Sequence, residues 1–305
     1  MAEWMRNPVK LAILLAVVLT VCTPVFASRR VTDELGRSLV VPDEPHRIIC
    51  LSPSLTETVY ELGLGDAVAG VTEYTSFPPE ARTKPSVGGL VNPSMETIVS
   101  LQPDLVLALR QINGENVVQQ LEHLAIPVFI VDPQGLDGVL ASIQHVGDAT
   151  NRSSEAQALV KRLKEKRDVV TATVNRLPRP KALVVIWYEP VITAGNKAFI
   201  TDVISAAGGE SVTSDISQAW PQISMEEVSR RSPDFLLLIK GLHGGITLEL
   251  LKGQQGWDHV EAVRHEHVIY VDERMELPSP LVFDALEELA RELHPSAFAR
   301  SELAR

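Results

Sequence analysis

The chain has 305 residues, of which 45% are hydrophobic and 22% charged, and its formal net charge is -11. This length is enough for two domains of ordinary size, and the composition is typical of a soluble globular protein. The negative charge argues against nucleic acid and anionic membrane surfaces as partners.

Residues 1–27 read as a secretory signal peptide. Arg6 and Lys10 precede an apolar run at residues 11–22, which is too short to span a bilayer comfortably, and residues 25–27 (VFA) match a small-x-small cleavage site. We therefore expect the mature protein in the periplasm. Lipid attachment at Cys22 is a less favoured alternative, because Val21 is larger than the residue that such a site prefers.

Without the signal peptide, Cys50 is the only cysteine, so a disulfide within the mature chain is excluded. Cys50 lies in an apolar strand, where we expect it to pack as a small hydrophobic residue.

Strands and helices alternate through the first half of the chain. Residues 28–45 predict a small hairpin closed at Gly36. The predicted strands that follow are residues 47–51, 67–71, 105–109 and 128–131. The predicted helices begin at Leu55, with Ser54 as the cap, and at residues 93–94, 116 and 136. The strands are continuous apolar runs, which is typical of a parallel sheet covered on both faces.

The second half repeats this order. The predicted strands are residues 182–187, 235–239 and 267–271, and the predicted helices are residues 197–207, 225–231, 247–252 and 280–293. Residues 94–109 and 224–239 align without a gap, and six of these sixteen positions are identical. We interpret this as a duplicated unit and expect two similar lobes with a cleft between them.

Residues 153–177 separate the two copies. Apolar residues recur there at helical spacing among many charged residues, and Pro178 and Pro180 follow. We expect one long helix lying across both lobes, with an ordinary surface helix of one lobe as the alternative. The predicted division is therefore a signal peptide at 1–27, an N-terminal α/β lobe at 28–150, a connecting helix at 151–178 and a C-terminal α/β lobe at 179–305.

Catalytic signatures are mostly missing from the sequence: it has no G-x-S-x-G, Walker, H-E-x-x-H or C-x-x-C motif. We expect no catalytic residues, no bound metal and no cofactor of its own. A less favoured alternative is an extracytoplasmic enzyme that holds a metal with His265, His267 and Glu273.

Aromatic residues between strands and helices point to a ligand. Tyr74 follows the second predicted strand, Trp187 and Tyr188 end the first strand of the second lobe, and Trp220 precedes the repeated helix. In open α/β sheets the ligand crevice lies outside the carboxyl ends of the strands, and flat side chains there suit a large, flat, partly apolar ligand. Trp257 and Tyr270 lie among apolar residues, so we expect them to fill the core of their lobe.

Glu96 and Glu226 occupy the same position in the two copies, in the first turn of a helix. A favourable interaction with the helix dipole explains either one alone, at about 0.3–1 kcal/mol. It does not explain why both flank the expected cleft. Two equivalent carboxylates on either side of a cleft suit a symmetric, basic partner.

As a set, the stretches RIICLSPSLTETVYELGLGDAVAGVTEYTSFPPEA, VGGLVNPSMETIVSLQPDLVLA and WPQISMEEVSRRSPDFLLL resemble the helical-backbone (class III) periplasmic binding proteins of metal-chelate ABC importers, most closely the cobalamin-binding branch. The resemblance covers nearly all of the mature chain. It implies two parallel-sheet α/β lobes joined by a single long helix. It also implies a monomeric receptor that delivers cobalamin or a related corrinoid to a permease dimer in the membrane.

The resemblance also assigns residues. Tyr74 and Trp220 match aromatic residues of the cobalamin site, and Glu96 and Glu226 match the two glutamates that pair with arginines of the permease. The expected ligand-binding set is Ser52, Pro53, Tyr74, Leu90, Trp187, Tyr188 and Trp220. Two positions depart from the cobalamin branch: Leu90 stands where it has a tryptophan, and Leu277 where it has an arginine. Haem, with Tyr74 as axial ligand, and a ferric siderophore stay open as alternative ligands.

Overall fold

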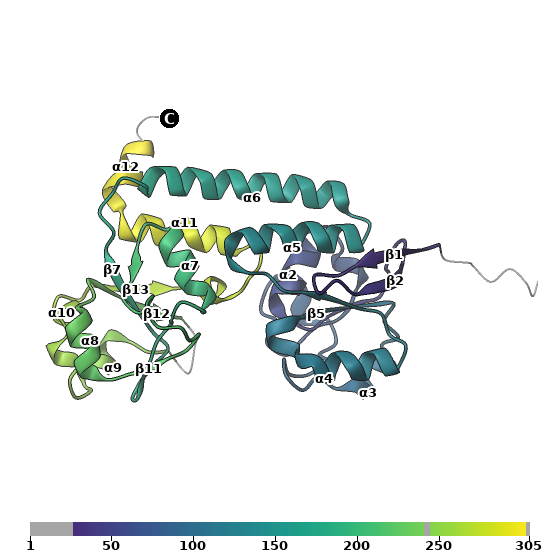
Figure 1. Cartoon of the computed structure of the whole chain (residues 1–305), viewed down its shortest axis with the longest axis horizontal. Helices are drawn as coiled ribbons and strands as arrows, with labels where there is room; N and C mark the ends of the chain where they lie inside the picture. The colour runs from purple at the N-terminus through teal and green to yellow at the C-terminus, as the bar shows by residue number, and fades with distance from the viewer. Residues whose placement is uncertain (1–26, 241–244, 303–305) are drawn as a thin grey trace, which may run out of the picture.

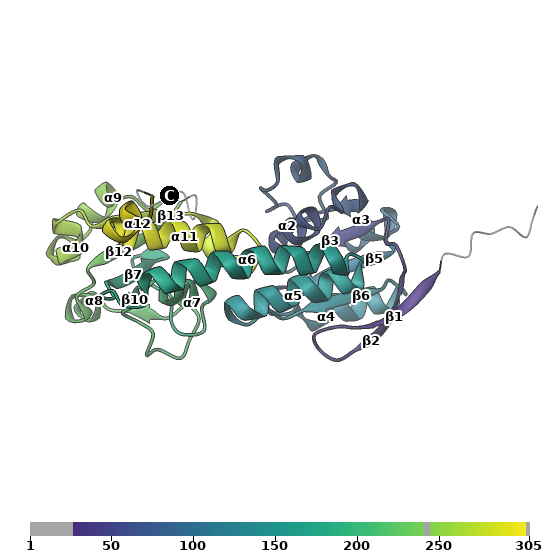
Figure 2. The same ribbon diagram turned by 90° about the horizontal axis from the view of Figure 1, so that it is seen from above.

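The computed structural model describes residues 27–240 and 245–302. The predicted signal peptide, apart from Ala27, and Cys22 lie outside the described residues. Two α/β lobes lie side by side beneath one long helix, α6 (Ser153–Val174), which runs along the long axis of the molecule (Figures 1 and 2). The predicted fold class is confirmed.

The sheet of the N-terminal lobe has four parallel strands in the order β4-β3-β5-β6. These are β3 (Ile48–Cys50), β4 (Val68–Gly70), β5 (Leu105–Leu109) and β6 (Val128–Val131). All residues of β3, β5 and β6 are buried, as expected for a sheet covered on both faces. Within it, Cys50 is fully buried, and burial raises the pKa of its thiol to about 12, so it packs as predicted.

Helices cover both faces of this sheet. They are α2 (Pro53–Glu61), α3 (Met95–Ser100), α4 (Arg110–His123) and α5 (Gly135–Ala149), with short 3-10 turns at Gly65–Ala67 and Pro79–Thr83. The predicted hairpin is confirmed as β1 (Ser28–Thr32) and β2 (Ser38–Pro42), which pair antiparallel. The cap of α2 is Ser52 and not Ser54, because Pro53 already occupies the first helical position.

The C-terminal lobe has an equivalent parallel sheet in the order β10-β7-β12-β13. Its strands are β7 (Lys181–Val185), β10 (Glu210–Ser211), β12 (Phe235–Ile239) and β13 (Val268–Val271). A small antiparallel sheet, which we did not predict, is formed by β8 (Trp187–Tyr188), β9 (Val191–Ile192) and β11 (Gln222–Ile223).

The helices of this lobe are α7 (Phe199–Ala206), α8 (Met225–Arg231), α9 (Leu248–Lys252), α10 (Glu261–Arg264), α11 (Val282–Leu293) and α12 (Pro295–Glu302). Two 3-10 turns, η5 (Trp257–His259) and η6 (Glu273–Glu276), complete it. The duplicated unit is visible at its helix starts. Ser94 accepts a hydrogen bond from the Thr97 amide at 3.2 Å, and Ser224 accepts one from the Glu227 amide at 3.1 Å.

Helix α6 packs against both lobes, on α5 of the first and on α7, α11 and α12 of the second. Its buried residues form one stripe: Ala156, Leu159, Leu163, Val170 and Val174. This stripe belongs to a single hydrophobic cluster that runs from β3 and β5 through α6 into α7 and α11. The lobes therefore share a core beneath α6, which makes the connection stiffer than a flexible linker.

Among residues 27–240 and 245–302, the structure has no helix with the length and hydrophobicity that a membrane crossing requires.

Candidate functional site

A cavity of about 890 Å³ lies between the two lobes. Its walls come from both halves of the chain: Leu109, Gln111, Ile112, Pro133, Gln134, Gly135, Asn196, Lys197, Ala198, Phe199, Ile200, Asp202, Ala219, Trp220, Glu276 and Pro278. Leu109 ends β5, Pro133 follows β6, and Glu276 follows β13. The cavity thus lies at the carboxyl ends of strands from both sheets, where parallel α/β sheets bind ligands.

In the N-terminal lobe, behind Leu109 of the cavity wall, Asn113 holds three segments together. Its side-chain amide donates hydrogen bonds to the carbonyl oxygens of Leu51 (2.8 Å) and Leu90 (2.9 Å). Its Oδ1 accepts a hydrogen bond from the Leu109 amide at 2.6 Å. Asn113 is buried and fixes Leu90, which is half-buried, beside the end of β5. We did not single out Asn113, because in sequence it reads as an ordinary polar residue of a loop.

On the C-terminal wall, two loops pair closely. The amides of Gly195 and Asn196 donate to the carbonyl oxygens of Ala219 (2.9 Å) and Ile216 (3.0 Å). A Cβ atom at Gly195 would lie 2.3 Å from the Gln218 carbonyl oxygen, so only glycine allows this approach. The pairing presents Trp220 to the cavity with 48% of its surface exposed.

The lobes also meet along a polar seam beside the cavity. The Ser76 hydroxyl, from the loop that carries Tyr74, donates to Glu273 Oε1 at 2.9 Å. Glu57 of α2 is 3% exposed, and within the described part of the chain its Oε2 has no hydrogen-bond partner. Burial raises the pKa of Glu57 to about 7, and the Ser279 hydroxyl acts in the opposite direction.

Two carboxyl groups in the cavity wall are also affected by their surroundings. Burial, and to a lesser extent the charge of Glu273, raises the pKa of Glu276 to about 7. Burial likewise raises the pKa of Asp202, whose Oδ2 lies 3.0 Å from where a Cβ atom on Gly135 would stand. Asp202 therefore reaches across from α7 to the beginning of α5 in the other lobe.

The structure brings together only part of the predicted ligand-binding set. Trp220 lines the cavity, and Leu90 and Tyr74 belong to loops tied to its edge through Asn113 and the Ser76–Glu273 bond. Tyr74 is 59% exposed. Ser52 and Pro53 are buried at the start of α2, where the Ser52 hydroxyl contacts that of Ser54 at 2.9 Å, and they do not line the cavity.

Trp187 and Tyr188 lie elsewhere. Their rings stack with centroids 5.1 Å apart, and Tyr188 lines a different cavity, of about 670 Å³, together with Met225 and Trp257. Trp257 is 1% exposed, as expected for a core residue. The prediction that Tyr270 fills the core is wrong: 43% of its surface is exposed, because its hydroxyl accepts a hydrogen bond from the Leu248 amide near the surface.

Glu96 and Glu226 are exposed in the first turns of α3 and α8. Neither carboxylate forms an ion pair with another residue in the described ranges 27–240 and 245–302. The neighbouring Glu227, in contrast, is held by Arg230 and Arg231. Both glutamates are therefore available to a partner on the surface of the molecule.

The residues of the alternative metal site do not converge. His265 and His267 precede β13, whereas Glu273 follows it, so the strand separates them. His265 instead contacts Glu261 at 3.0 Å. Within the part of the chain that the structure describes, no three His, Cys, Asp or Glu residues are grouped to hold a metal ion.

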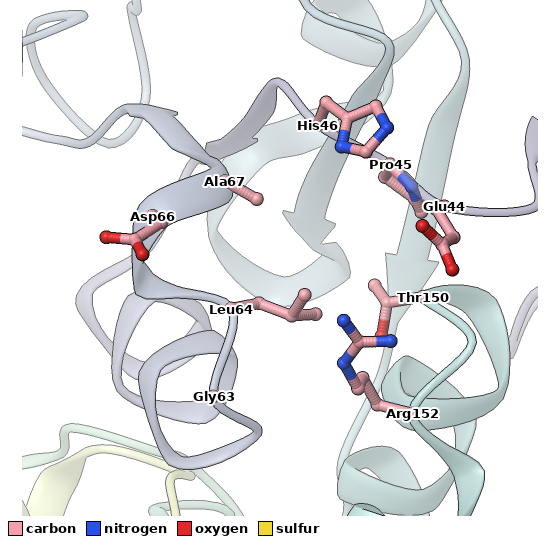
Figure 3. Close-up of a pocket in the computed structure, with 9 residues that line it drawn as sticks. All are labelled: Glu44, Pro45, His46, Gly63, Leu64, Asp66, Ala67, Thr150 and Arg152. Atoms are coloured by element: carbon pink, nitrogen blue, oxygen red, sulfur yellow. The ribbon is translucent and has the colours of Figure 1, made fainter.

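A smaller cavity of about 330 Å³ lies on the N-terminal lobe alone. Figure 3 shows its lining, in which Thr150 lies between Glu44 and Arg152. His46 precedes β3 and Ala67 precedes β4, so this cavity lies at the amino ends of the strands. That is the edge of a parallel sheet opposite to the usual ligand position, and we do not assign the ligand to it.

Residues 48–275 match the model of the family described as periplasmic binding protein. An uncharacterized ABC transporter substrate-binding lipoprotein, YvrC of Bacillus subtilis (strain 168), is 29% identical over 276 residues, which are 88% of this chain and 86% of that protein. The vitamin B12-binding protein of Yersinia pestis (strain Pestoides F) is 29% identical over 192 residues, which are 63% of this chain and 69% of that protein.

Solved structures of similar shape align with this chain over almost the entire length of the solved proteins. The periplasmic heme-binding protein RhuT from Roseiflexus sp. RS-1 in apo form has a TM-score of 0.76 at 25% identity, covering 83% of this chain and 99% of that chain. The periplasmic vitamin B12 binding protein BtuF of Vibrio cholerae has a TM-score of 0.72 at 23% identity, covering 82% of this chain and 97% of that chain. The second likeness concerns the fold alone.

Proposed function

This chain belongs to the periplasmic binding protein family, and from that premise we propose that it captures cobalamin or a related corrinoid outside the cytoplasm and delivers it to the permease of an ABC importer. Its relatives are substrate-binding proteins of ABC transporters, and none of those described above is named as an enzyme. The proposed role is therefore binding and delivery without chemistry, with the corrinoid as cargo.

The observation that carries this proposal is the lining of the interlobe cavity. Trp220, Phe199, Ile112 and Pro278 supply apolar surface, while Gln111, Gln134 and Asn196 supply uncharged amides. A corrinoid is a large ring with an apolar face and a periphery of carboxamides. Amide side chains can both donate to and accept from such groups, and an exposed indole suits the face of the ring.

The charges in the wall support a corrinoid over ligands that carry several anionic groups. Among the described residues that line the cavity, Asp202 and Glu276 are acidic and Lys197 is the one basic residue. Haem carries two propionates and catecholate siderophores carry more negative charge, so each would leave an anion without a cationic partner. Haem stays the second candidate, because the similar structure from Roseiflexus is named as a heme-binding protein.

We further propose Tyr74, Leu90 and Trp220 as ligand contacts. Trp220 lines the cavity, Leu90 is tied through Asn113 to the end of β5, and Tyr74 is two residues from Ser76, which bonds Glu273 of the other lobe. For the other members of the expected set we propose only that they support the surrounding loops: Ser52, Pro53, Trp187 and Tyr188. We also keep the predicted division into an N-terminal lobe (28–150), a connecting segment (151–178) and a C-terminal lobe (179–305). The packing of α6 against both lobes supports this division.

Glu96 and Glu226 are proposed to dock the receptor on the permease dimer. They occupy equivalent positions in the two lobes, are exposed and have no ion pair within the described residues. Two equivalent carboxylates match two equivalent basic sites on a symmetric dimer. A monomeric receptor is sufficient for this arrangement, because each lobe supplies one of the two contacts.

We propose secretion by the predicted signal peptide. The alternative, lipid attachment at Cys22, is supported by the name of the Bacillus subtilis relative, which is a lipoprotein. Mass spectrometry of the mature N-terminus separates the two: cleavage after Ala27 gives a free amine on Ser28, whereas a lipoprotein begins at Cys22 and carries acyl chains.

The test of function is ligand binding by the purified protein. We expect cyanocobalamin to bind with a Kd below about 1 μM, and haemin and ferric catecholate siderophores to bind more weakly. Isothermal titration calorimetry measures the affinities, with a second cyanocobalamin titration of a Trp220→Ala variant to locate the site. Haemin binding more tightly than every corrinoid would replace the first candidate by the second.

A further inference from the structure

Lys197 has an unusual position among the basic residues near the cavity. Arg110, which follows β5 in the other lobe, donates to Asp132 at 2.8 Å, and Arg274 within η6 donates to Asp272 at 2.8 Å. Lys197 lines the cavity, is exposed, and forms no ion pair with another residue of the described ranges. The cavity thus offers one ammonium group that the protein itself does not neutralise.

The two acidic residues of the wall do not approach Lys197 within the 4.0 Å of an ion pair. Asp202 is directed instead towards Gly135 in the other lobe. Burial raises the pKa of Glu276 to about 7, so this carboxyl group is only partly ionised near neutral pH, and burial also raises the pKa of Asp202. The ammonium group of Lys197 therefore has no ion-pair partner among the described residues of the cavity wall.

The backbone at Lys197 is held in place by its surroundings. Its amide donates to the Gln218 carbonyl oxygen at 3.3 Å, next to the bonds that Gly195 and Asn196 form with the same loop. That loop continues into Trp220. One wall of the cavity therefore carries an exposed indole for the face of a ring and, on a backbone held to the same loop, an ammonium group for an anion.

We propose that Lys197 recognises a single anionic group of the ligand, the phosphodiester of a complete corrinoid, and selects complete corrinoids over those that lack it. This assignment rests on the corrinoid-binding function proposed above and adds which group of the ligand Lys197 binds. Complete corrinoids carry one phosphodiester among neutral carboxamides, which matches one lysine among amide side chains. An ammonium group binds phosphate oxygens as a point charge with three donors.

Two ligands test the assignment, cyanocobalamin and dicyanocobinamide, which has the same corrin ring without the nucleotide loop and its phosphodiester. Each is titrated into the wild type, Lys197→Met and Lys197→Arg. Methionine keeps the length and volume of the side chain and removes its charge, whereas arginine keeps the charge. Cobinamide affinity serves as the folding control for each variant, because it reports the rest of the cavity.

We expect Lys197→Met to lower affinity for cyanocobalamin roughly 10- to 100-fold, the range of a hydrogen bond to a charged group, and to leave cobinamide affinity unchanged. Lys197→Arg should retain most of the preference. Raising the ionic strength should weaken the binding of cyanocobalamin to the wild type and to Lys197→Arg. It should not change the binding of cyanocobalamin to Lys197→Met, or of cobinamide to any of the three proteins.

An equal loss for both ligands, or no loss for either, overturns the assignment while leaving corrinoid binding intact. Failure of the wild type to bind either ligand overturns the corrinoid function itself, and the assignment with it.

Discussion

Lys166 and Arg167 are consecutive residues of α6, yet they pair with carboxylates of opposite lobes. Lys166 pairs with Asp284, and its Nζ lies 3.6 Å from Glu287, both on α11 of the C-terminal lobe. Arg167 pairs with Asp137 at the start of α5 in the N-terminal lobe. Successive helical residues point about 100° apart, so one turn of α6 is attached to both lobes at once.

The first prediction concerns this attachment. The Arg167 side chain is 16% exposed, whereas that of Arg162, also on α6, is 65% exposed and pairs with Glu61 of α2. Arg167→Met should lower the free energy of unfolding by about 1 kcal/mol, and Arg162→Met by less than about 0.5 kcal/mol, because exposed ion pairs contribute little. Urea denaturation measures both. Equal losses would mean that burial does not strengthen the Arg167 pair.

The second prediction separates two tryptophans. Trp220 is 48% exposed and Trp257 is 1% exposed. Trp220→Ala should weaken corrinoid binding by roughly 10-fold or more with little change in stability, because its indole has few contacts to lose in the free protein. Trp257→Ala should cost about 3–5 kcal/mol of stability by leaving a cavity in the core.

Thermal unfolding and ligand titration of both variants check this contrast. A Trp220→Ala variant that is as unstable as Trp257→Ala would place Trp220 in the core of its lobe, and the proposed ligand contact would be wrong.

The third prediction concerns docking. Reversing both Glu96 and Glu226 to Lys should leave ligand affinity intact and abolish uptake, since like charges would then face the basic sites of the permease. Uptake of radiolabelled cobalamin by cells that depend on this receptor measures the effect. Glu165→Lys, at an exposed position on α6 away from α3 and α8, is the matched control for a change of surface charge. Uptake that persists in the double variant rules out this docking role.

The fourth prediction is a dependence of stability on pH. Burial raises the pKa of Glu57 from its ordinary value of 4.5 to about 7 in the folded protein. The folded state then holds a proton that the unfolded chain releases between these values. The free energy of unfolding should therefore fall as pH rises from about 4.5 to 7, and this contribution should level off above about pH 7.

Glu57→Gln should flatten this slope and should be more stable than the wild type at pH 8, because the amide does not ionise in the seam between the lobes. Glu276→Gln should remove a comparable part, since burial raises the pKa of Glu276 to about 7 as well. Denaturation curves at pH 5, 6, 7 and 8 measure both. A Glu57→Gln variant with the slope of the wild type would show that another group is responsible.

Much of the architecture followed from local patterns. The strands at residues 105–109, 128–131 and 235–239 and the helix at 225–231 have the predicted bounds, because an uninterrupted apolar run or a capped amphipathic run is encoded by neighbouring residues. The repeat likewise predicted equivalent lobes. The small sheet of β8, β9 and β11 was missed because its strands have two residues each and carry no periodicity.

The site was less predictable, for reasons that lie in packing between distant segments. Trp187 and Trp220 both lie near a junction of strand and helix in the predicted pattern, which treated them alike. In the structure Trp220 lines the interlobe cavity, while Trp187 stacks on Tyr188 away from it. We did not predict Lys197 as a site residue, because a single lysine before a helix is common. Its position became informative only in the structure, where its backbone is bonded to the loop at 216–219 that leads into Trp220.

Residues near one another in the chain were enough to specify two α/β lobes, the long helix between them and the equivalent positions of Glu96 and Glu226, since these depend on local hydrophobic periodicity and on an internal repeat. Which side chains face the cavity was decided only when separate segments came together: Leu51 and Asn113 in the N-terminal lobe, Gly195 and Ala219 in the C-terminal lobe, and Ser76 and Glu273 across the lobes. The same packing buried Glu57 against the second lobe and left the Lys197 side chain without an ion-pair partner among the described residues. Sequence neighbours do not decide either outcome, because desolvation and ion pairing depend on all the groups that surround a side chain in space.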